Sequence, residues 1–126
     1  RYTYAIGGNE ETVKLSGINS SFFKTMVYVI SGATAGISAL ILTSRLNSAG
    51  PTAGLTYELT VIASVVIGGS SLSGGLGTVC GSLIGVLLIA VTNNGMNLLG
   101  ISPYFQELAR GVIIILAVYI DRLREQ

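Results

Sequence analysis

Long apolar stretches separated by short polar segments set the pattern of this chain. No charged residue lies between Lys24 and Arg45, and none lies between Glu58 and Glu107. A helix of about 20 apolar residues is about 30 Å long, which matches the hydrocarbon core of a bilayer. The first apolar stretch therefore predicts one membrane helix, at 25–44. The second is too long for one crossing, and its length fits two.

Segments rich in glycine, asparagine and proline interrupt these apolar stretches and set the predicted helix ends. They are the loop around Pro51, the segment GGSSLSGGLG at 68–77, and the asparagine-rich TNNGMNLLGISP that ends at Pro103. The fold expected is all-α, a transmembrane bundle of about four membrane-spanning helices. The predicted helices are 25–44, 58–72, 77–93 and 104–120, within a transmembrane region 25–120 that is followed by a tail at 121–126. The second of these is short for a crossing, so two crossings flanking a re-entrant hairpin remain the alternative.

Residues 1–24 precede the first membrane helix and contain the one clearly polar helical pattern of the chain. Asn9 is a good N-cap, Glu10 and Glu11 place negative charge at the positive end of a helix dipole, and Ser16-Gly17 supplies a stop. Such a helix of about two turns is marginal alone in water. We expect it to form against its own membrane domain, a partner, or both.

Basic residues gather at the two ends of the chain. Arg1, Lys14 and Lys24 precede the first membrane helix, and two arginines follow the last, whereas the first interhelical loop has only Arg45. By the positive-inside rule both ends are cytoplasmic, which requires an even number of crossings.

The composition supports a membrane chain and excludes several kinds of site. Among its 126 residues 50% are hydrophobic and 10% are charged, with a mean hydropathy of +0.70, whereas soluble domains carry about 25% charged residues. A net charge of +1 gives no basic surface for nucleic acid. Histidine is absent and Cys80 is the only cysteine, so we expect no metal site and no catalytic residues. The chain begins at Arg1 and shows no signal peptide, so we expect it to be a piece of a longer protein.

Two glycine patterns and one charged pair are candidates for helix packing. Gly32 and Gly36 form a small-xxx-small pair, and a second stripe recurs every four residues at Gly77, Gly81 and Gly85. The alternative for each is the ordinary glycine content of membrane helices. Glu107 and Arg110 are three residues apart, hence on one helical face, and we expect them to form an ion pair near the membrane surface. The segment 68–77 contains no lysine and has apolar flanks, so it does not fit a phosphate-binding P-loop.

Four blocks of the sequence, in order, resemble a known family. AIGGNEETVKLSGI, SRLNSAGPTAGLTYEL, VVIGGSSLSGGLGT and NNGMNLLGIS are similar to the C-terminal part of the membrane subunit of ribose-type ABC importers, the permeases that take up ribose and related sugars in bacteria. The resemblance implies a multi-pass protein of the bacterial inner membrane that forms a homodimer. It also implies a cytoplasmic ABC ATPase subunit and a periplasmic sugar-binding protein as partners. ATP and Mg would then be held by the ATPase, with no cofactor in this chain.

The resemblance further implies that 5–18 is a coupling segment, the short cytoplasmic helix that sits in a cleft on the ATPase and passes its closure to the membrane helices. The coupling residues expected are Asn9, Glu10, Glu11, Val13, Lys14, Leu15, Ser16 and Gly17. Of these, the charged residues are the expected surface contacts, and Val13 and Leu15 are the expected apolar anchors. From the residues alone, a plain interhelical loop with one helical turn is an equal alternative.

The sugar path is the least defined part of the prediction. Polar candidates in an otherwise apolar wall are Tyr57, Asn93, Asn94, Asn97 and Gln106, each of which also fits a role at a helix end or an interface. The sequence departs from the family pattern at Leu55-Thr56, where a glycine often precedes the tyrosine, at Thr60, where an acidic residue is frequent, and at Pro103, where serine is common. These positions fall in the outer loop and its edges, so the departures bear on the identity of the sugar more than on the transporter assignment.

Two other functions fit parts of the sequence. A small four-helix proton-coupled exporter shares the chain length but needs a carboxylate in the middle of its first membrane helix, and 25–44 has none. A membrane structural or oligomerisation module is suggested by the stripe that begins at Gly77.

Overall fold

A computed structural model describes residues 1–124 and 126, and the residues that it describes form helices and loops without a strand. The all-α prediction is confirmed. The six helices are α1 (Tyr2–Gly8), α2 (Glu10–Leu15), α3 (Ser20–Leu46), α4 (Tyr57–Ile67), α5 (Val79–Leu98) and α6 (Pro103–Arg124). They divide into two compact units, Arg1–Leu55 and Thr56–Gln126, which are described separately.

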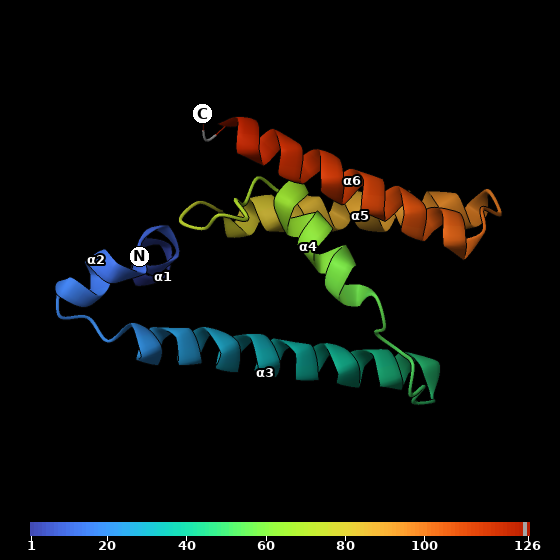
Figure 1. Cartoon of the computed structure of the whole chain (residues 1–126). Helices are drawn as coiled ribbons and strands as arrows, with labels where there is room; N and C mark the ends of the chain where they lie inside the picture. The colour runs from blue at the N-terminus through green and yellow to red at the C-terminus, as the bar shows by residue number, and fades with distance from the viewer. Residues whose placement is uncertain (125) are drawn as a thin grey trace. The chain divides into compact units, whose positions relative to one another are not determined.

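In the first unit, α1 and α2 pack against the N-terminal end of the long helix α3 (Figure 1). Helix α1 was not predicted. Its contact with α3 includes the rings of Tyr2 and Phe23, whose centroids are 4.9 Å apart. Helix α3 begins at Ser20, earlier than the predicted start at residue 25, because the side chain of Asn19 accepts a hydrogen bond from the backbone of Phe22 and caps the helix there.

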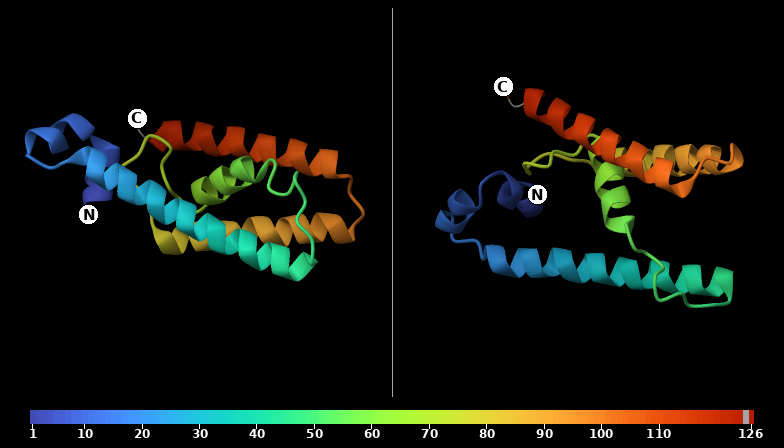
Figure 2. Two further views of the ribbon diagram at one scale, coloured as in Figure 1. Left: turned by 90° about the horizontal axis from the view of Figure 1, so that it is seen from below. Right: turned by 45° about the vertical axis from the view of Figure 1, so that its right-hand side comes forward.

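In the second unit, α4 lies between α5 and α6 and contacts both (Figure 2). Small residues of α4 form the buried part of this contact: Ala63 is fully buried and Ser64 is 2% exposed. The loop between α4 and α5 contains the glycine-rich segment 68–77, and α5 and α6 are joined by a short turn.

The helix ends differ from the prediction mainly in α4 and α5. Helix α4 has 11 residues, so it is about 16 Å long, because the chain leaves the helix at Gly68. Helix α5 starts after Thr78, whose hydroxyl accepts a hydrogen bond from the backbone of Gly81. It then continues through the asparagine-rich segment to Leu98, and Gly100 follows its C-terminal cap.

The end of α5 is a Schellman motif. Gly100 has a φ of +70°, its backbone N–H donates to the carbonyl of Asn97, and the N–H of Ile101 donates to the carbonyl of Met96. The asparagines were expected to form a loop, but the chain first requires a left-handed residue only at Gly100, so they stay in the helix.

Three helices, α3, α5 and α6, are long and apolar enough to cross a membrane, and α4 is a shorter apolar helix. Most of their large apolar side chains are exposed in this chain. The hydrophobic effect would oppose such exposure in water, so these surfaces require lipid or further protein around them.

Candidate functional site

The predicted coupling segment is helix α2 with its two caps. Asn9 is the N-cap, and its side chain accepts a hydrogen bond of 3.1 Å from the backbone of Thr12. Glu10 and Glu11 lie in the first turn, and the helix gives way at Ser16 to Gly17, which has a φ of +79°. The predicted cap, acidic turn and glycine stop are therefore present in the structure.

Glu10 is the most connected polar side chain of this segment. Its Oε1 pairs with Lys14 Nζ at 2.9 Å and accepts a hydrogen bond of 3.3 Å from Ser20 Oγ, and its Oε2 pairs with Lys24 Nζ at 2.5 Å. Hydrogen bonds from Lys24, and then from Lys14, lower the pKa of Glu10 from 4.5 to about 2. The carboxylate therefore stays ionised at any pH near neutrality.

The two faces of α2 differ in what they leave accessible. Val13 is 7% exposed, packed inside the first unit, whereas Leu15 is 89% exposed. Glu11 is exposed as well, and it forms no ion pair in the part of the chain that the structure describes. Glu10, Val13 and Lys14 thus make contacts within the chain, and Leu15 with Glu11 is the face that remains open.

Of the five sugar-path candidates, the structure brings three into a polar cluster between α5 and α6. Gln106 is 5% exposed, and its Nε2 donates to Asn97 Oδ1 at 2.8 Å and to the carbonyl of Ile101 at 3.2 Å. One turn further along, Arg110 Nη2 donates to Asn93 Oδ1 at 3.4 Å. The remaining two candidates lie outside the cluster: Asn94 is exposed on α5, and Tyr57 is 57% exposed at the start of α4.

The predicted ion pair between Glu107 and Arg110 is wrong for the described residues, because Arg110 contacts Asn93 on the facing helix instead. Sequence reasoning therefore missed Arg110 as a member of the polar cluster. The signal available was its spacing of four from Gln106, which places both side chains on one face of α6.

The two glycine patterns have different surroundings. On α5, a Cβ added at Gly81 would lie 2.2 Å from the carbonyl oxygen of Gly68, and one at Gly85 would lie 1.9 Å from that of Ser64. These two glycines are therefore required for the close crossing of α4 and α5. A Cβ at Gly77 would lie 2.7 Å from Ser70 Oγ in the loop, whereas a Cβ at Gly32 or Gly36 would meet no atom within 4 Å.

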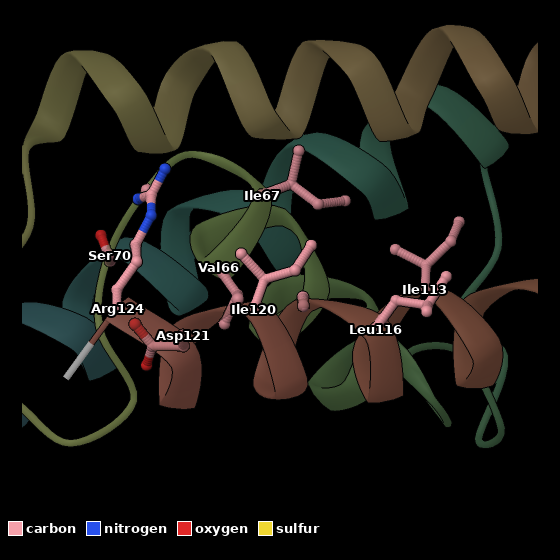
Figure 3. Close-up of a pocket in the computed structure, with 10 residues that line it drawn as sticks. Val66, Ile67, Ser70, Ile113, Leu116, Ile120, Asp121 and Arg124 are labelled. Atoms are coloured by element: carbon pink, nitrogen blue, oxygen red, sulfur yellow. The ribbon is translucent and has the colours of Figure 1, made fainter. Parts of the chain in front are cut away.

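A cavity of about 340 Å³ lies between α4 and α6 (Figure 3). Its wall is apolar, with Ile67 and Ile120 among the lining residues, and Asp121 and Arg124 lie at its polar end. Asp121 is already hydrogen-bonded: its Oδ2 accepts hydrogen bonds from Ser71 Oγ at 3.1 Å and from the backbone N–H of Leu72 at 3.0 Å. This carboxylate holds the glycine-rich segment at the C-terminal end of α6, a role that the sequence did not reveal.

None of these places has the composition of a catalytic centre or a metal site. Among the described residues no group of three or more carboxylate, cysteine or histidine side chains could hold a metal ion. What the geometry offers is a capped surface helix tied to one long apolar helix, and a short apolar helix packed against two longer ones, with a polar cluster at one end of the longer pair.

Three candidate membrane spans and a small surface helix in an all-α chain define the class of this protein as a multi-pass membrane protein. The chain matches over residues 1–118 the family described as the permease component of branched-chain amino acid transport systems, and it belongs to that family. It is also similar to individual sugar permeases.

It is 53% identical over 122 residues to the ribose import permease protein of Bacillus subtilis (strain 168), covering 97% of this chain and 38% of the relative. It is 50% identical over 125 residues to that of Escherichia coli (strain K12), covering 99% of this chain and 39% of the relative. It is 46% identical over 121 residues to the xylose transport system permease protein of Haemophilus influenzae, covering 96% of this chain and 32% of the relative.

The predicted resemblance to ribose-type permeases is thus confirmed. The chain spans less than two fifths of the length of these relatives. No solved structure is significantly similar to it.

Proposed function

We propose that this chain is part of the permease subunit of a bacterial ABC importer that moves a monosaccharide across the inner membrane. The observation that carries the proposal is identity of about half the residues, over nearly the whole chain, with proteins named as ribose import permeases. Identity is lower, 46%, to the relative named for xylose, so ribose is the sugar that we propose.

In this proposal the energy comes from ATP bound with Mg on a separate cytoplasmic ATPase subunit, and a periplasmic binding protein delivers the sugar. The absence of a carboxylate from α3 argues against the small proton-coupled exporter. A second copy of the permease completes the transporter, and the open faces of Gly32 and Gly36 on α3 suit close approach by another helix.

Helix α2 is the proposed contact with the ATPase, through its open face. Leu15 supplies an apolar anchor and Glu11 a charge, while Asn9, Ser16 and Gly17 define the ends of the helix. The proposed orientation places α2 and the C-terminal tail in the cytoplasm, as the distribution of Lys and Arg favours.

The polar cluster of Asn93, Asn97 and Gln106 lies at the end of the α5–α6 pair remote from Asp121. We propose it, together with Tyr57 and Asn94, as the part of the chain nearest to the sugar's route. Amide groups suit this role, because they donate and accept hydrogen bonds and sugar hydroxyls need both.

The transport proposal is tested with the full-length protein in a bacterium that lacks its own ribose permease. Uptake of labelled ribose should return, and a hundredfold excess of unlabelled xylose should compete weakly. Normal membrane insertion without uptake of labelled ribose would overturn the proposal.

The coupling contact is tested by capture of the ATPase subunit. Wild-type permease should retain it, and the double variant Glu11→Arg, Leu15→Asp should not. Glu58→Arg is the matched control, since it reverses one exposed carboxylate at the start of α4, on the side proposed to be outside. Equal capture by all three proteins would contradict the assignment of α2.

A further inference from the structure

Helices α2 and α3 are joined by a linker of four residues, 16–19, that does not fix their relative direction by itself. Gly17 within it has a φ of +79°, a conformation that glycine adopts without strain. The described backbone hydrogen bonds of the linker run back into α2: the N–H of Ser16 donates to the carbonyls of Thr12 and Val13, and that of Gly17 donates to the carbonyl of Lys14. Side chains must therefore hold α2 against α3.

One carboxylate connects the two helices across this linker. Glu10 of α2 accepts a hydrogen bond from Ser20 Oγ at 3.3 Å and pairs with Lys24 Nζ at 2.5 Å, and both partners lie in the first two turns of α3. Ser20 is 3% exposed, so its hydroxyl is directed into the contact between the two helices. Lys14 pairs with the same carboxylate from one turn along α2.

This arrangement differs from an isolated surface ion pair, which contributes little to stability. Both oxygens of Glu10 are used, each on α3, so rotation of α2 breaks at least one contact. Glu11, the adjacent carboxylate, has no ion-pair partner among the described residues. Two adjacent glutamates of α2 therefore differ in one respect: Glu10 is bonded to α3, and Glu11 is not.

We propose that Glu10 is a positioning residue that makes α2 and α3 move as a single body. A displacement of α2 would then be delivered to the whole of α3 and would not be absorbed by the linker at Gly17. This inference rests on the proposed function, because it assigns to Glu10 the transfer of movement from the ATPase contact to a membrane helix.

The functional test uses the full-length permease reconstituted with its ATPase and binding protein. In Glu10→Gln the sugar taken up per ATP hydrolysed should fall about fivefold, at the lower end of typical coupling between sites. Retention of the ATPase should not change, and the control Glu58→Gln, which changes an exposed carboxylate of the second unit, should leave the ratio unchanged. An unaltered ratio in Glu10→Gln would overturn the inference.

A charge exchange separates positioning from simple loss of stability. Lys14→Ala serves as the background, because Lys14 would repel a new lysine at position 10. Glu10→Lys and Lys24→Glu should each lower uptake per ATP, and the two together should restore it to within about twofold of the background. Failure of the exchange to restore any uptake per ATP would contradict a positioning role.

A distance measurement tests the same inference without transport. Spin labels at Leu15→Cys and Thr34→Cys are placed in a full-length permease without other cysteines, which is mixed with excess unlabelled permease. The distance between the labels then reports the direction of α2 relative to α3 within one copy. A single narrow distance should broaden in Glu10→Gln and stay narrow in Glu11→Gln. If Glu10→Gln leaves the distance narrow, the inference is wrong, whether or not the protein imports sugar.

Discussion

At the scale of single residues, Glu10 contributes stability that depends on pH only well below the physiological range. Two lysines lower its pKa from 4.5 to about 2, so the folded state favours the ionised carboxylate. The stability that this gives is complete above pH 4.5 and is lost as the pH falls toward 2.

We therefore expect the difference in unfolding midpoint between wild type and Glu10→Gln to be constant above pH 4.5 and to shrink below it. Removing the largest cause of the lowered pKa, in Lys24→Met, should move this decline to higher pH. Unfolding in detergent followed by circular dichroism across pH 2–7 measures both. A difference that grows on acidification would contradict the sign of the pKa shift.

Thr56 is a second residue whose conformation makes a prediction. It precedes α4 with a φ of +70°, and its side chain forms no capping hydrogen bond. A left-handed conformation costs a non-glycine residue about 1–2 kcal/mol in the folded state. Glycine avoids this cost, but it also makes the unfolded chain more flexible, which cancels part of the gain in stability.

Thr56→Gly should accordingly raise the free energy of unfolding by about 0.5–1 kcal/mol. Thr52→Gly is the control, because Thr52 lies in the same connection without a positive φ and should gain nothing. Denaturant titration of the two purified variants compares them. Equal effects of the two substitutions would show that Thr56 is not strained.

At the scale of helices, hydropathy and caps predicted most of what the structure contains. Apolar length located α3, α5 and α6, and Asn9 located α2, because both signals are local in sequence. Pairing between helices was harder to predict. The bond from Gln106 to Asn97 and the Arg110–Asn93 contact depend on how α5 and α6 face each other, which no single segment encodes.

The close crossing of α4 and α5 depends on glycine at Gly85, and substitution there can test this dependence. At Gly85 an added methyl group would lie 1.9 Å from the carbonyl oxygen of Ser64, whereas at Gly95 on the same helix it would meet nothing within 4 Å. Gly85→Ala should destabilise the protein by about 1–3 kcal/mol through overpacking. Gly95→Ala should stabilise it by about 0.5–1 kcal/mol, as alanine does in a helix interior. Unfolding in mixed micelles distinguishes them, and identical stabilities would exclude a close crossing at Gly85.

The polar cluster makes a prediction about the pairing of α5 and α6. Since Gln106 is buried and bonded to Asn97, a double-mutant cycle of Asn97→Ala and Gln106→Ala should give a coupling of about 0.6–1.7 kcal/mol, which lies between the average and the largest coupling found for interhelical hydrogen bonds in a membrane protein. A cycle of Gln106→Ala with Asn94→Ala is the control, because Gln106 donates its hydrogen bond to Asn97 and not to Asn94, and its coupling should be near zero. Comparable coupling in both cycles would mean that the bond to Asn97 contributes nothing specific.

At the scale of the whole molecule, contacts within the second unit decide which segments share an end of the helix bundle. Asp121, near the C-terminal end of α6, binds Ser71 and the backbone of Leu72, so the glycine-rich segment lies at that end. Asn97 and Gln106 meet at the other end of α5 and α6. Helix α5 has 20 residues and is therefore about 30 Å long, enough to separate the two ends by a bilayer.

This arrangement predicts the topology of the full-length permease. In a Cys80→Ser background, single cysteines at Ser73 and Gln126 should react with an impermeant thiol reagent from the same side of the membrane, and one at Asn97 from the opposite side. The side that carries Ser73 should be the cytoplasm, in accordance with the basic residues at both ends of the chain. Labelling of Ser73 and Asn97 from one side would favour the re-entrant hairpin. In that case α4, at about 16 Å, would be the half-helix that enters the bilayer, and the chain after the glycine-rich segment would return to the same face.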